Sequence, residues 1–593
     1  MGTMRREEQI AEAEEMLGES LDKRGFVKSL FFGNYAAETL PQYPVAAMND
    51  PVTTKMADEL RSYCQSSIDP VAIDRDARIP DSVIHGLGQL GVLGACLPKD
   101  CGGRALSQTN YCKILEVLGG HCASTALFVN AHHSIGPRAI VLFGTDEQKK
   151  TYLPKLASGE WISAFALTET EAGSDAGNVQ TTATPTPDGE GFIVNGTKRW
   201  ITNGGIAQAL TLIARTPAPS NGSTRASSKP TAFLVTPDMP GFKVLEERMP
   251  KCGVRGTATA RLAFENMYVP RKNILGQLGK GLKVALTVLD FGRTTFGASC
   301  TGAAKYCLKQ AAAQANNRVQ FGQRIGEFEL VKDKLARMAA GIFAMESCTY
   351  QTAALIDAGS DDYMLETAIL KVMATDTLWT IVNDTIQIYG GKAYFTDEPY
   401  ERIMRDARIN MIGEGANDVL KAFVALVGMR DVGLHLQGIL QSLKHPLKNF
   451  GRLTSFAGKR LESLFRAPEV PIRNQQLLGE AEALSQSTAL FGSYVEKLLA
   501  KYKEGIVDRQ YHAGRIADAV IELYSSACML RRLDTIFDQY PEGSFERIDA
   551  YRTGSFAMKL SDRKLRRALA DLWDNDDDDS NDVANAALGW EKH

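Results

Sequence analysis

Residues Met404–Lys421 read MRDARINMIGEGANDVLK, and this stretch carries the clearest chemical signal of the chain. It predicts a helix that ends, a loop of Gly413, Glu414 and Gly415, and a second helix that starts at an Asn-Asp cap. A carboxylate between two glycines is sterically open, so Glu414 is a candidate general base if dry surroundings raise its pKa. Taken alone, a glutamate in a turn is usually just solvated.

Two stretches upstream of this loop suit a nucleotide-like ligand. In NNRVQFGQR, Arg318 and Phe321 are three residues apart, which predicts that they share a helix face. Arginine can hold a pyrophosphate with two hydrogen bonds while phenylalanine packs under a ring. QIYGG, at Gln387–Gly391, interrupts a helix with two glycines and lets the backbone approach a ligand. An exposed Arg beside a buried Phe, and a simple helix C-cap, are the structural alternatives.

Two hydroxyl-rich segments lie further towards the N-terminus. FALTETEAGSD, at Phe165–Asp175, leaves an apolar strand and enters hydroxyls, small residues and glycine, which suit a phosphate or a polar ring edge. NGTKRWITNGG, at Asn195–Gly205, is predicted to place Trp200 and Thr202 on one face of a strand. An indole and a hydroxyl in that arrangement would suit a flavin. Two hydroxyl-rich hairpins with a core Trp200 are an equally weighted alternative.

The spacing of apolar residues and the residue types along the chain predict helices, then strands, then helices again. From about residue 48 to 161 apolar residues recur three and four apart, as in Val83–Leu93. From about 163 to 269, short β-branched or aromatic runs broken by Gly, Pro, Asn and Asp predict antiparallel strands, with a loop at Thr216–Pro230. Long helices return from 281 to about 427. A linker at Lys444–Gly458 leads to a last helical region that ends near Leu572, and the acidic DNDDDDSND beyond it predicts a frayed tail.

We therefore expect a multidomain, mainly α protein, because 593 residues exceed what one hydrophobic core usually organises. The expected parts are an N-terminal extension (1–50), a helical N-domain (51–162), a middle antiparallel β domain (163–275), a helical-bundle domain with the candidate base (276–430), an additional C-terminal helical domain (431–575) and an acidic tail (576–593).

Composition excludes several other classes of protein. A net charge of -3 gives no general attraction to nucleic acid, and no run approaches the roughly 20 apolar residues of a membrane span. Residues 1–20 lack the apolar core of a secretory signal. The ten cysteines show no CxxC spacing, which fits reduced thiols in a cytoplasm. His132 and His133 are adjacent, but no Cys/His cluster accompanies them, so we expect no protein-held metal.

GLGQLG, at Gly86–Gly91, matches the GxGxxG pattern of dinucleotide-binding loops. It lies inside a helical pattern, and no acidic residue follows at the expected spacing of about 20 positions. A tight crossing of two helices is the better interpretation.

Five motifs, in this order and at these spacings, resemble the acyl-CoA dehydrogenase family: ALTETEAGSD, WITNGG, RVQFGQ, QIYGG and IGEGAND. The resemblance runs from about Val52 to Val427. It implies that the β domain and the third region hold FAD between them, and that the chain oxidises a fatty acyl-CoA to a trans-2-enoyl-CoA. In that reaction Glu414 would remove the α-proton while the β-hydrogen leaves as hydride to flavin N5.

The resemblance also implies roles for individual residues. Thr168 matches the residue that bonds the flavin ring, and Trp200 and Thr202 match those flanking its N5 side. Arg318 and Phe321 match the surface that holds the FAD of a neighbouring subunit, which implies an oligomer. The implied cofactor-binding residues are Phe165, Leu167, Thr168, Gly173, Ser174, Trp200, Thr202, Arg318, Phe321, Gln387, Gly390, Gly391, Ala416 and Asp418. The implied substrate-binding residues are Ser174, Asp290, Arg293 and Gly415.

The chain departs from the family pattern at three places. Thr170 and Glu171 stand where Pro-Gly is usual, which would reshape the phosphate turn. Ala416 stands where a threonine is common, which removes one expected hydrogen bond to FAD. Gly413 replaces a bulky aromatic residue and leaves room beside the reacting carbons.

The chain ends resemble those of the very-long-chain subclass, at Lys503–Arg532 and Phe26–Tyr35. This implies a homodimer whose added domain covers the surface that shorter relatives use to form tetramers. Small residues from Ser124 to Ala131, on the helix that resembles the floor of the acyl pocket, favour a long chain. Electron-transfer flavoprotein is the implied acceptor. We expect a cytoplasmic location, and a mitochondrial matrix location stays open.

Residues 432–466 alternate apolar clusters with basic side chains. As helices they would form an in-plane amphipathic element and a peripheral contact with the inner face of a membrane. A connecting segment that packs on the dehydrogenase body would show the same pattern, so the two interpretations have equal weight.

Two rival functions remain. An acyl-CoA oxidase would run the same half-reaction with O₂ as acceptor. An assembly or scaffold protein would keep the fold and FAD without catalysis, and the intact Glu414 argues against that.

Overall fold

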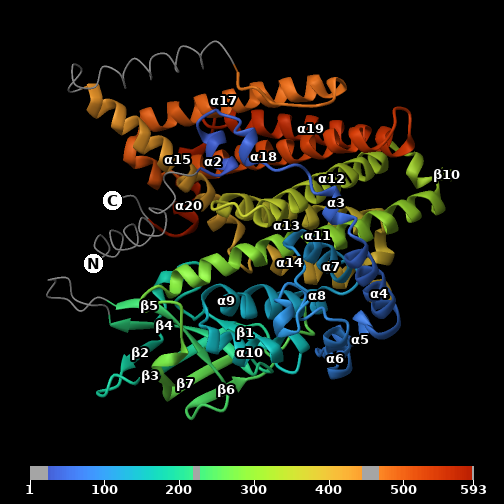
Figure 1. Cartoon of the computed structure of the whole chain (residues 1–593). Helices are drawn as coiled ribbons and strands as arrows, with labels where there is room; N and C mark the ends of the chain where they lie inside the picture. Colours follow the sequence, from blue (N-terminus) through green and yellow to red (C-terminus); the bar gives the residue numbers. More distant parts are fainter. Residues whose placement is uncertain (1–23, 218–227, 444–466, 591–593) are drawn as a thin grey trace. The chain divides into compact units, whose positions relative to one another are not determined.

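The computed structural model describes residues 24–217, 228–443 and 467–590 (Figure 1). Contacts group them into two compact units. The described part of unit 1 comprises 44–359 and 370–416, and that of unit 2 comprises 24–43, 360–369 and 417–590. The six domains expected from the sequence stay a prediction, because each of the two compact units contains several of them.

Unit 1 begins with helices, as the periodicity of residues 48–161 predicts. They are α3 (Val45–Met48), α4 (Pro51–Ser67), α5 (Pro70–Asp76), α6 (Asp81–Gln89), α7 (Gln108–Gly119), α8 (Ala123–Asn130), a π-helical turn (Ala131–Ile135), α9 (Gly136–Phe143) and α10 (Asp146–Ser158). The start of α4 shows why the helices begin where they do. Asp50 accepts from the backbone N–H of Thr53 at 2.8 Å, and Pro51 occupies the first turn.

The GLGQLG motif lies in α6 and the turn that ends it, so the interpretation as a helix crossing is confirmed. A Cβ atom on Gly86 would lie 2.0 Å from the hydroxyl oxygen of Tyr63, which belongs to α4. Glycine at this position therefore leaves room for the Tyr63 side chain, and a Cβ atom on Gly88 would lie 2.5 Å from the carbonyl oxygen of Ser158, so the close helix approach is between α6 and α10.

A sheet follows, as predicted for residues 163–269. Its strands are β1 (Ser163–Ala166), β2 (Thr182–Pro185), β3 (Gly191–Ile201), β4 (Ala209–Pro217), β5 (Ser228–Val235), β6 (Phe242–Glu246), β7 (Ala260–Pro270) and β8 (Ile274–Leu275). Their order is β6-β7-β3-β2-β4-β5-β8, with β1 on β4. Most pairs are antiparallel, but β1 and β2 both meet β4 in parallel. The loop predicted at Thr216–Pro230 is shorter than expected, because β4 and β5 extend into both of its ends, and residues 218–227 lie outside the described part.

One hydrophobic core joins this sheet to helices. It contains Ile140 of α9, Leu156 of α10, Ile213 of β4, Leu234 of β5 and Val288 of α11 (Gly281–Asn317). Figure 1 shows α9 and α10 beside the strands. Burial of both apolar faces fixes the sheet against these helices, so the strand ends that carry the hydroxyl-rich motifs have a rigid support.

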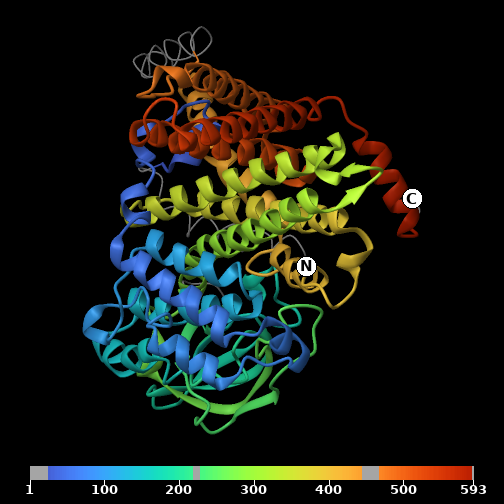
Figure 2. The same cartoon turned by 90° about the vertical axis from the view of Figure 1, so that its right-hand side faces the viewer.

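Long helices complete unit 1. They are α11, α12 (Glu329–Asp357), the larger part of α13 (Met364–Tyr389), a 3-10 turn (Gly390–Tyr394), α14 (Tyr400–Arg408) and a 3-10 turn (Ile409–Met411). Figure 2 shows α11 and α12 running side by side. Their connection contains the short hairpin β9 (Val319–Gln320) and β10 (Gln323–Arg324).

The hairpin corrects one prediction. Arg318 and Phe321 do not share a helix face, because α11 ends at Asn317 and Phe321 turns the hairpin with a φ of 52°. Helical spacing in the sequence could not reveal this, since the left-handed conformation at Phe321 ends the periodicity. The predicted helix break at QIYGG is confirmed, because α13 ends at Tyr389, directly before the two glycines, whereas the approach of a ligand there stays a prediction.

Unit 2 is helical, as predicted for the C-terminal region. It contains α2 (Phe26–Phe31), the first turns of α13, α15 (Asn417–Leu443), α17 (Leu478–Tyr502), α18 (Gln510–Gln539), α19 (Phe545–Ala570) and α20 (Asp577–Ala587). All six residues of α2 are buried, against α15, α17 and α18.

The acidic tail is not frayed, contrary to the prediction. Residues 577–587 form α20, and both guanidinium nitrogens of Arg515 bond to Asp577 at 2.6 and 2.7 Å. Acidic side chains in the first turn of a helix also favour its formation through the helix dipole.

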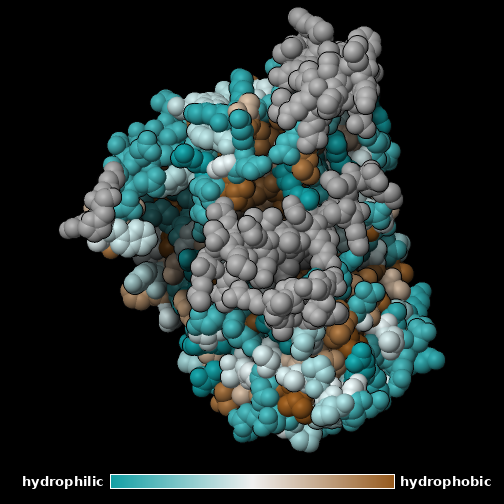
Figure 3. All heavy atoms as spheres, turned by 90° about the vertical axis from the view of Figure 1, so that its left-hand side faces the viewer, coloured by the Kyte–Doolittle hydropathy of each residue, from teal (hydrophilic) through white to brown (hydrophobic). Residues whose placement is uncertain are grey.

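The proposed amphipathic stretch is only partly described. Residues Val432–Leu443 continue α15, whereas 444–466 and the linker at Lys444–Gly458 lie outside the described residues. Within the described ranges, no helix is both long and apolar enough to cross a membrane. On the face shown in Figure 3, hydrophilic residues cover most of the coloured surface and hydrophobic residues form separate patches.

A buried charged cluster holds α2 in unit 2. Lys28 pairs with Asp362 at 2.9 Å, and Glu366 accepts from the backbone N–H of Val27 at 2.8 Å. Burial raises the pKa of Glu366 from 4.5 to about 8, assisted by the charge of Asp362. The folded state therefore holds a proton there that the unfolded chain releases. Its contribution to stability is complete below pH 4.5 and is lost as the pH rises through about 8.

We expect Glu366→Gln to stabilise unit 2 above pH 8, because the amide keeps the acceptor for Val27 and removes the buried charge. The Tm of unit 2 should rise by a few degrees, since about 1 kcal/mol shifts a unit of this size by roughly 2–4 °C. Glu482→Gln, at an exposed position of α17, is the control. Equal loss of Tm with rising pH in wild type and Glu366→Gln would contradict this assignment.

Candidate active site

The loop with Glu414 joins the 3-10 turn Ile409–Met411 to α15, as the sequence predicts. Glu414 has a φ of 56° and Gly415 a φ of 103°, so two consecutive residues adopt positive φ. For glutamate this backbone is strained and persists only where surrounding contacts support it. Strain of this kind often marks a functional position.

The carboxylate of Glu414 has one hydrogen-bonded oxygen and one free oxygen. Its Oε1 accepts from Asn130 Nδ2 at 3.1 Å, whereas its Oε2 is buried and has no partner among the described residues. The Asn130 amide has a fixed orientation because its Oδ1 accepts from Ser134 Oγ at 2.8 Å and from Thr295 Oγ1. The free oxygen is thus presented by a rigid network.

Two buried cations contact the peptide groups of the same loop. Arg293 Nε donates to the Glu414 carbonyl at 3.4 Å, and Lys371 Nζ donates to the Gly415 carbonyl at 2.7 Å. Burial raises the pKa of Glu414 from 4.5 to about 7, while the charges of Arg293 and Lys371 act in the opposite direction. A carboxylate with a pKa near neutrality is matched to general base catalysis.

Gly292 of α11 leaves the space that the carboxylate occupies. A Cβ atom at this position would lie 2.6 Å from Glu414 Oε2, which is closer than non-bonded atoms approach. Any other residue would displace the carboxylate, so this glycine is part of the site.

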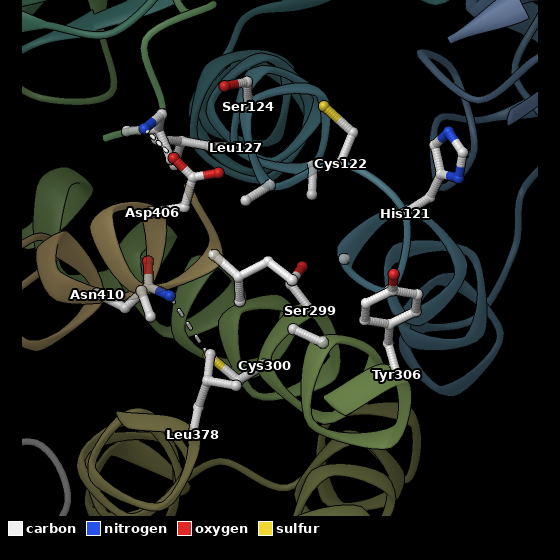
Figure 4. A pocket seen from close by; sticks show the side chains of 18 of the residues that line it. His121, Cys122, Ser124, Leu127, Ser299, Cys300, Tyr306, Leu378, Asp406 and Asn410 are labelled. Carbon is white, nitrogen blue, oxygen red and sulfur yellow. Dashed lines mark hydrogen bonds between the residues drawn. The ribbon is translucent and has the colours of Figure 1, made fainter. Parts of the chain in front are cut away.

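A cavity of about 300 Å³ opens beside Asn130 and extends between α8, α11 and α14. In Figure 4, α8 with Leu127 lies on one side of it, and Ser299 and Tyr306 of α11 lie on the other. From Phe296 to Tyr306 it follows α11 for about 15 Å, at 1.5 Å per residue. The prediction of small side chains on α8 is borne out in part: of residues 124–131, Ser124 and Ala126 line the cavity, and so do the larger Leu127 and Asn130.

The two hydroxyl-rich segments meet, as a common binding site requires. The backbone N–H of Arg199 donates to the Thr168 carbonyl at 2.9 Å. The buried Lys198 donates to the Leu167 carbonyl at 2.8 Å and pairs with Glu169 at 2.6 Å. Contacts between the end of β1 and the end of β3 therefore hold these segments together.

The prediction that Trp200 and Thr202 share a strand face is wrong. Trp200 lies in a β-bulge between Lys198 and Ile201 with a φ of 59°, and Thr202 lies beyond the end of β3 in a turn. The bulge breaks the alternation of the strand and leaves the indole 52% exposed. Trp200 is thus not a core residue.

The remaining predicted cofactor residues fall into separate places. Phe165 is buried in β1, whereas Gly173 and Ser174 lie in the exposed turn after it. Phe321 is 95% exposed at the hairpin tip, next to the exposed Arg318. Gln387, Gly390 and Gly391 are exposed at the end of α13, where Tyr389 Oη donates to the Gln310 carbonyl of α11 at 3.2 Å. Ala416 ends unit 1, and Asp418 is an exposed residue of unit 2.

The two predicted substrate-binding residues of α11 are buried and paired. Arg293 Nη1 contacts Asp290 Oδ1 at 3.0 Å, and the same guanidinium supports the Glu414 loop. Their structural role in the loop is therefore visible, whereas contact with a CoA chain stays a prediction. The sequence did not single out Asn130, Gly292 or Lys371, since a polar residue or glycine within a helical run carries no local signal.

Comparison with known proteins agrees with this architecture. Family models match at residues 51–160 (acyl-CoA dehydrogenase, N-terminal domain), 164–267 (middle domain), 279–428 (C-terminal domain) and 475–586 (ACAD9/ACADV, C-terminal domain). The very long-chain specific acyl-CoA dehydrogenase, mitochondrial, of Macaca fascicularis is 36% identical over 520 residues, which cover 86% of this chain and 79% of that protein.

Two solved structures extend the comparison. An acyl-CoA dehydrogenase complexed with FAD from Bacillus anthracis superimposes with a TM-score of 0.77 at 26% identity and covers 95% of both chains. Butyryl-CoA dehydrogenase from Megasphaera elsdenii has a TM-score of 0.59 at 31% identity and covers 62% of this chain and 96% of its own.

The environment of Glu414 predicts a carboxyl group that titrates near pH 7. In infrared difference spectra of wild type against Glu414→Gln, the band of the protonated acid should fade with a midpoint near that pH, because burial disfavours the charged form. Glu160→Gln removes an exposed carboxylate and should not change this band. A titration midpoint at the pKa of a solvated glutamate, about 4.3, would show that water solvates the Glu414 carboxylate.

Proposed function

The chain belongs to the acyl-CoA dehydrogenase family, and from this premise we propose that Glu414 is the base in the FAD-dependent α,β-dehydrogenation of a long-chain fatty acyl-CoA. The product would be a trans-2-enoyl-CoA, as in fatty acid β-oxidation. The observation that carries this proposal is the buried, unpartnered Oε2 of Glu414, whose other oxygen is bonded by Asn130, a residue that lines the cavity.

The residues on β1 and β3 fit a bound flavin. Trp200 presents a half-exposed indole, and within the described chain no hydrogen bond occupies the hydroxyl group of Thr168 or Thr202. A side chain added at Gly173, Gly390 or Gly391 would meet no atom within 4 Å, so these backbones are open to a ligand. When bound, FAD supplies the acceptor for the hydride that leaves the β-carbon.

The chain itself handles the proton. Asn130 holds Oε1 of Glu414, so the free Oε2 accepts the α-proton of an acyl chain in the cavity. Gly292 leaves the carboxylate in place, and the buried surroundings exclude water from the reacting carbons. The thioester end would lie beside Glu414 and the hydrocarbon chain along α11.

We expect Glu414→Gln to fold and retain FAD but to lose turnover by about 10²–10⁴-fold, the usual contribution of a general base. Purified protein would be assayed with palmitoyl-CoA and a dye acceptor, and its FAD content would be read from the visible spectrum. Glu160→Gln should keep wild-type turnover. Near-normal activity of Glu414→Gln would exclude Glu414 as the base, whereas a wild type that binds FAD but shows no turnover would favour the scaffold alternative.

The length of the cavity supports a long acyl chain. Its lining between Phe296 and Tyr306 is formed by Ser299, Cys300 and Ala303 on α11, and small residues leave room for a hydrocarbon chain. Ala303 lies about two-thirds of the way along this path, roughly 10 Å from Phe296 along the helix axis. A bulky side chain there would close the distal third.

We expect Ala303→Phe to lower kcat/KM for palmitoyl-CoA by roughly tenfold or more while butyryl-CoA keeps its rate, because steric exclusion of a few methylenes costs about 1–3 kcal/mol. Ala313→Phe places the same side chain at an exposed position of α11 and is the matched control. Equal losses for both substrates would argue against an acyl chain in this cavity. A wild type that prefers butyryl-CoA to palmitoyl-CoA would contradict the proposed long-chain substrate.

We propose electron-transfer flavoprotein as the acceptor and a homodimer as the active form. The exposed aromatic side chains of Phe321, Tyr394 and Phe395 support an interface on this part of unit 1. Turnover with electron-transfer flavoprotein, dye and oxygen would separate a dehydrogenase from an oxidase.

A cytoplasmic location also stays a proposal. The proposed peripheral membrane contact through residues 432–466 can be tested by liposome flotation.

A further inference from the structure

Lys371 is a buried cation that the proposed reaction does not use. It lies on α13 with no exposed surface, and its ammonium donates to the Gly415 carbonyl at 2.7 Å. Burying an ammonium group is costly unless the charge is stabilised by its surroundings. The position of this charge therefore requires an explanation, and the contact places it on the residue that follows Glu414.

We propose that Lys371 is the positioning residue of the catalytic loop: it holds the Gly415 carbonyl, fixes the left-handed turn of Glu414, and supplies positive charge that favours the ionised carboxylate. This inference rests on the proposed role of Glu414 as base and adds the residue that prepares it. Lys371 acts through Glu414 and the loop, and no contact with substrate is needed.

The contacts of the loop explain why one lysine has this effect. Glu414 and Gly415 both have positive φ, and their carbonyls are held from two different helices, by Arg293 of α11 and Lys371 of α13. Loss of either donor would leave a buried carbonyl without a strong partner, at a backbone that is already strained. Arg293 also pairs with Asp290, and the Lys371 ammonium donates to the loop at the Gly415 carbonyl.

The charges around Lys371 and Glu414 come from three helices. The charged Arg293 and Asp290 and the neutral thiol of Cys300 lie on α11, Lys371 and Asp376 lie on α13, and the neutral Asn130 of α8 bonds to the carboxylate. Burial lowers the pKa of Lys371 to about 8, and the charge of Glu414 opposes that shift. Because the two groups interact, their titration belongs to the pair.

The test compares Lys371→Met with Lys371→Arg. Lys371→Met should move the infrared midpoint of Glu414, and the acid limb of the kcat/KM profile, upward by roughly one pH unit, since a nearby opposite charge shifts a carboxyl pKa by about 1–3 units. Lys371→Arg keeps the charge and should return both midpoints towards wild type. FAD content should stay unchanged in both variants.

Lys305→Met is the matched control. Lys305 is another lysine of the helical core, paired with Glu116 at 2.7 Å and with Glu346, and it lies roughly 18 Å along α11 from Arg293. Its removal should lower Tm without moving either midpoint. If Lys371→Met lowers only Tm or kcat and leaves both midpoints in place, Lys371 is a packing residue and the proposal fails.

The two proposals fail in different ways. High activity of Glu414→Gln would exclude Glu414 as the general base. An inactive Glu414→Gln together with an unchanged Glu414 midpoint in Lys371→Met would support Glu414 as the base and exclude only the positioning role of Lys371. The infrared titration gives this answer independently of turnover.

Discussion

A carboxylate that is removed from water keeps its charge only when nearby groups stabilise it, and this constraint organises the centre of unit 1. Glu414 has one hydrogen bond, from Asn130, and two cations behind the peptide groups of its loop. Helices α8, α11 and α13 each supply one of these contacts. Their packing is thus the condition for a base whose second oxygen remains free.

The same packing encloses the cavity that we propose for the acyl chain. α8 and α11 bring Asn130 and Gly292 to the carboxylate, and their continuation lines the cavity. The proposed substrate path and the proposed base therefore share two helices. A change that tilted either helix would move the cavity and Glu414 together, so the proposed alignment of acyl chain and base depends on this helix pair.

Strained backbone recurs at the positions that the family motifs mark. Trp200, Phe321 and Glu414 all have positive φ although none is glycine. In each case the unusual backbone turns the side chain out of the regular element: the indole at a bulge, the phenyl ring at a hairpin tip, and the carboxylate in a loop. Two predictions from regular periodicity, a shared strand face and a shared helix face, failed at these positions for this reason.

The sequence by itself determined the order of helical and β regions, the helix breaks at QIYGG and IGEGAND, and Glu414 as the candidate base, because periodicity, glycine and caps act over a few residues. Only the tertiary structure decided that Asn130, Gly292 and Lys371 complete the site. They are separated from Glu414 by 284, 122 and 43 positions in the sequence and meet it only when α8, α11 and α13 pack together. The pKa of Glu414 likewise depends on burial, which no local pattern encodes.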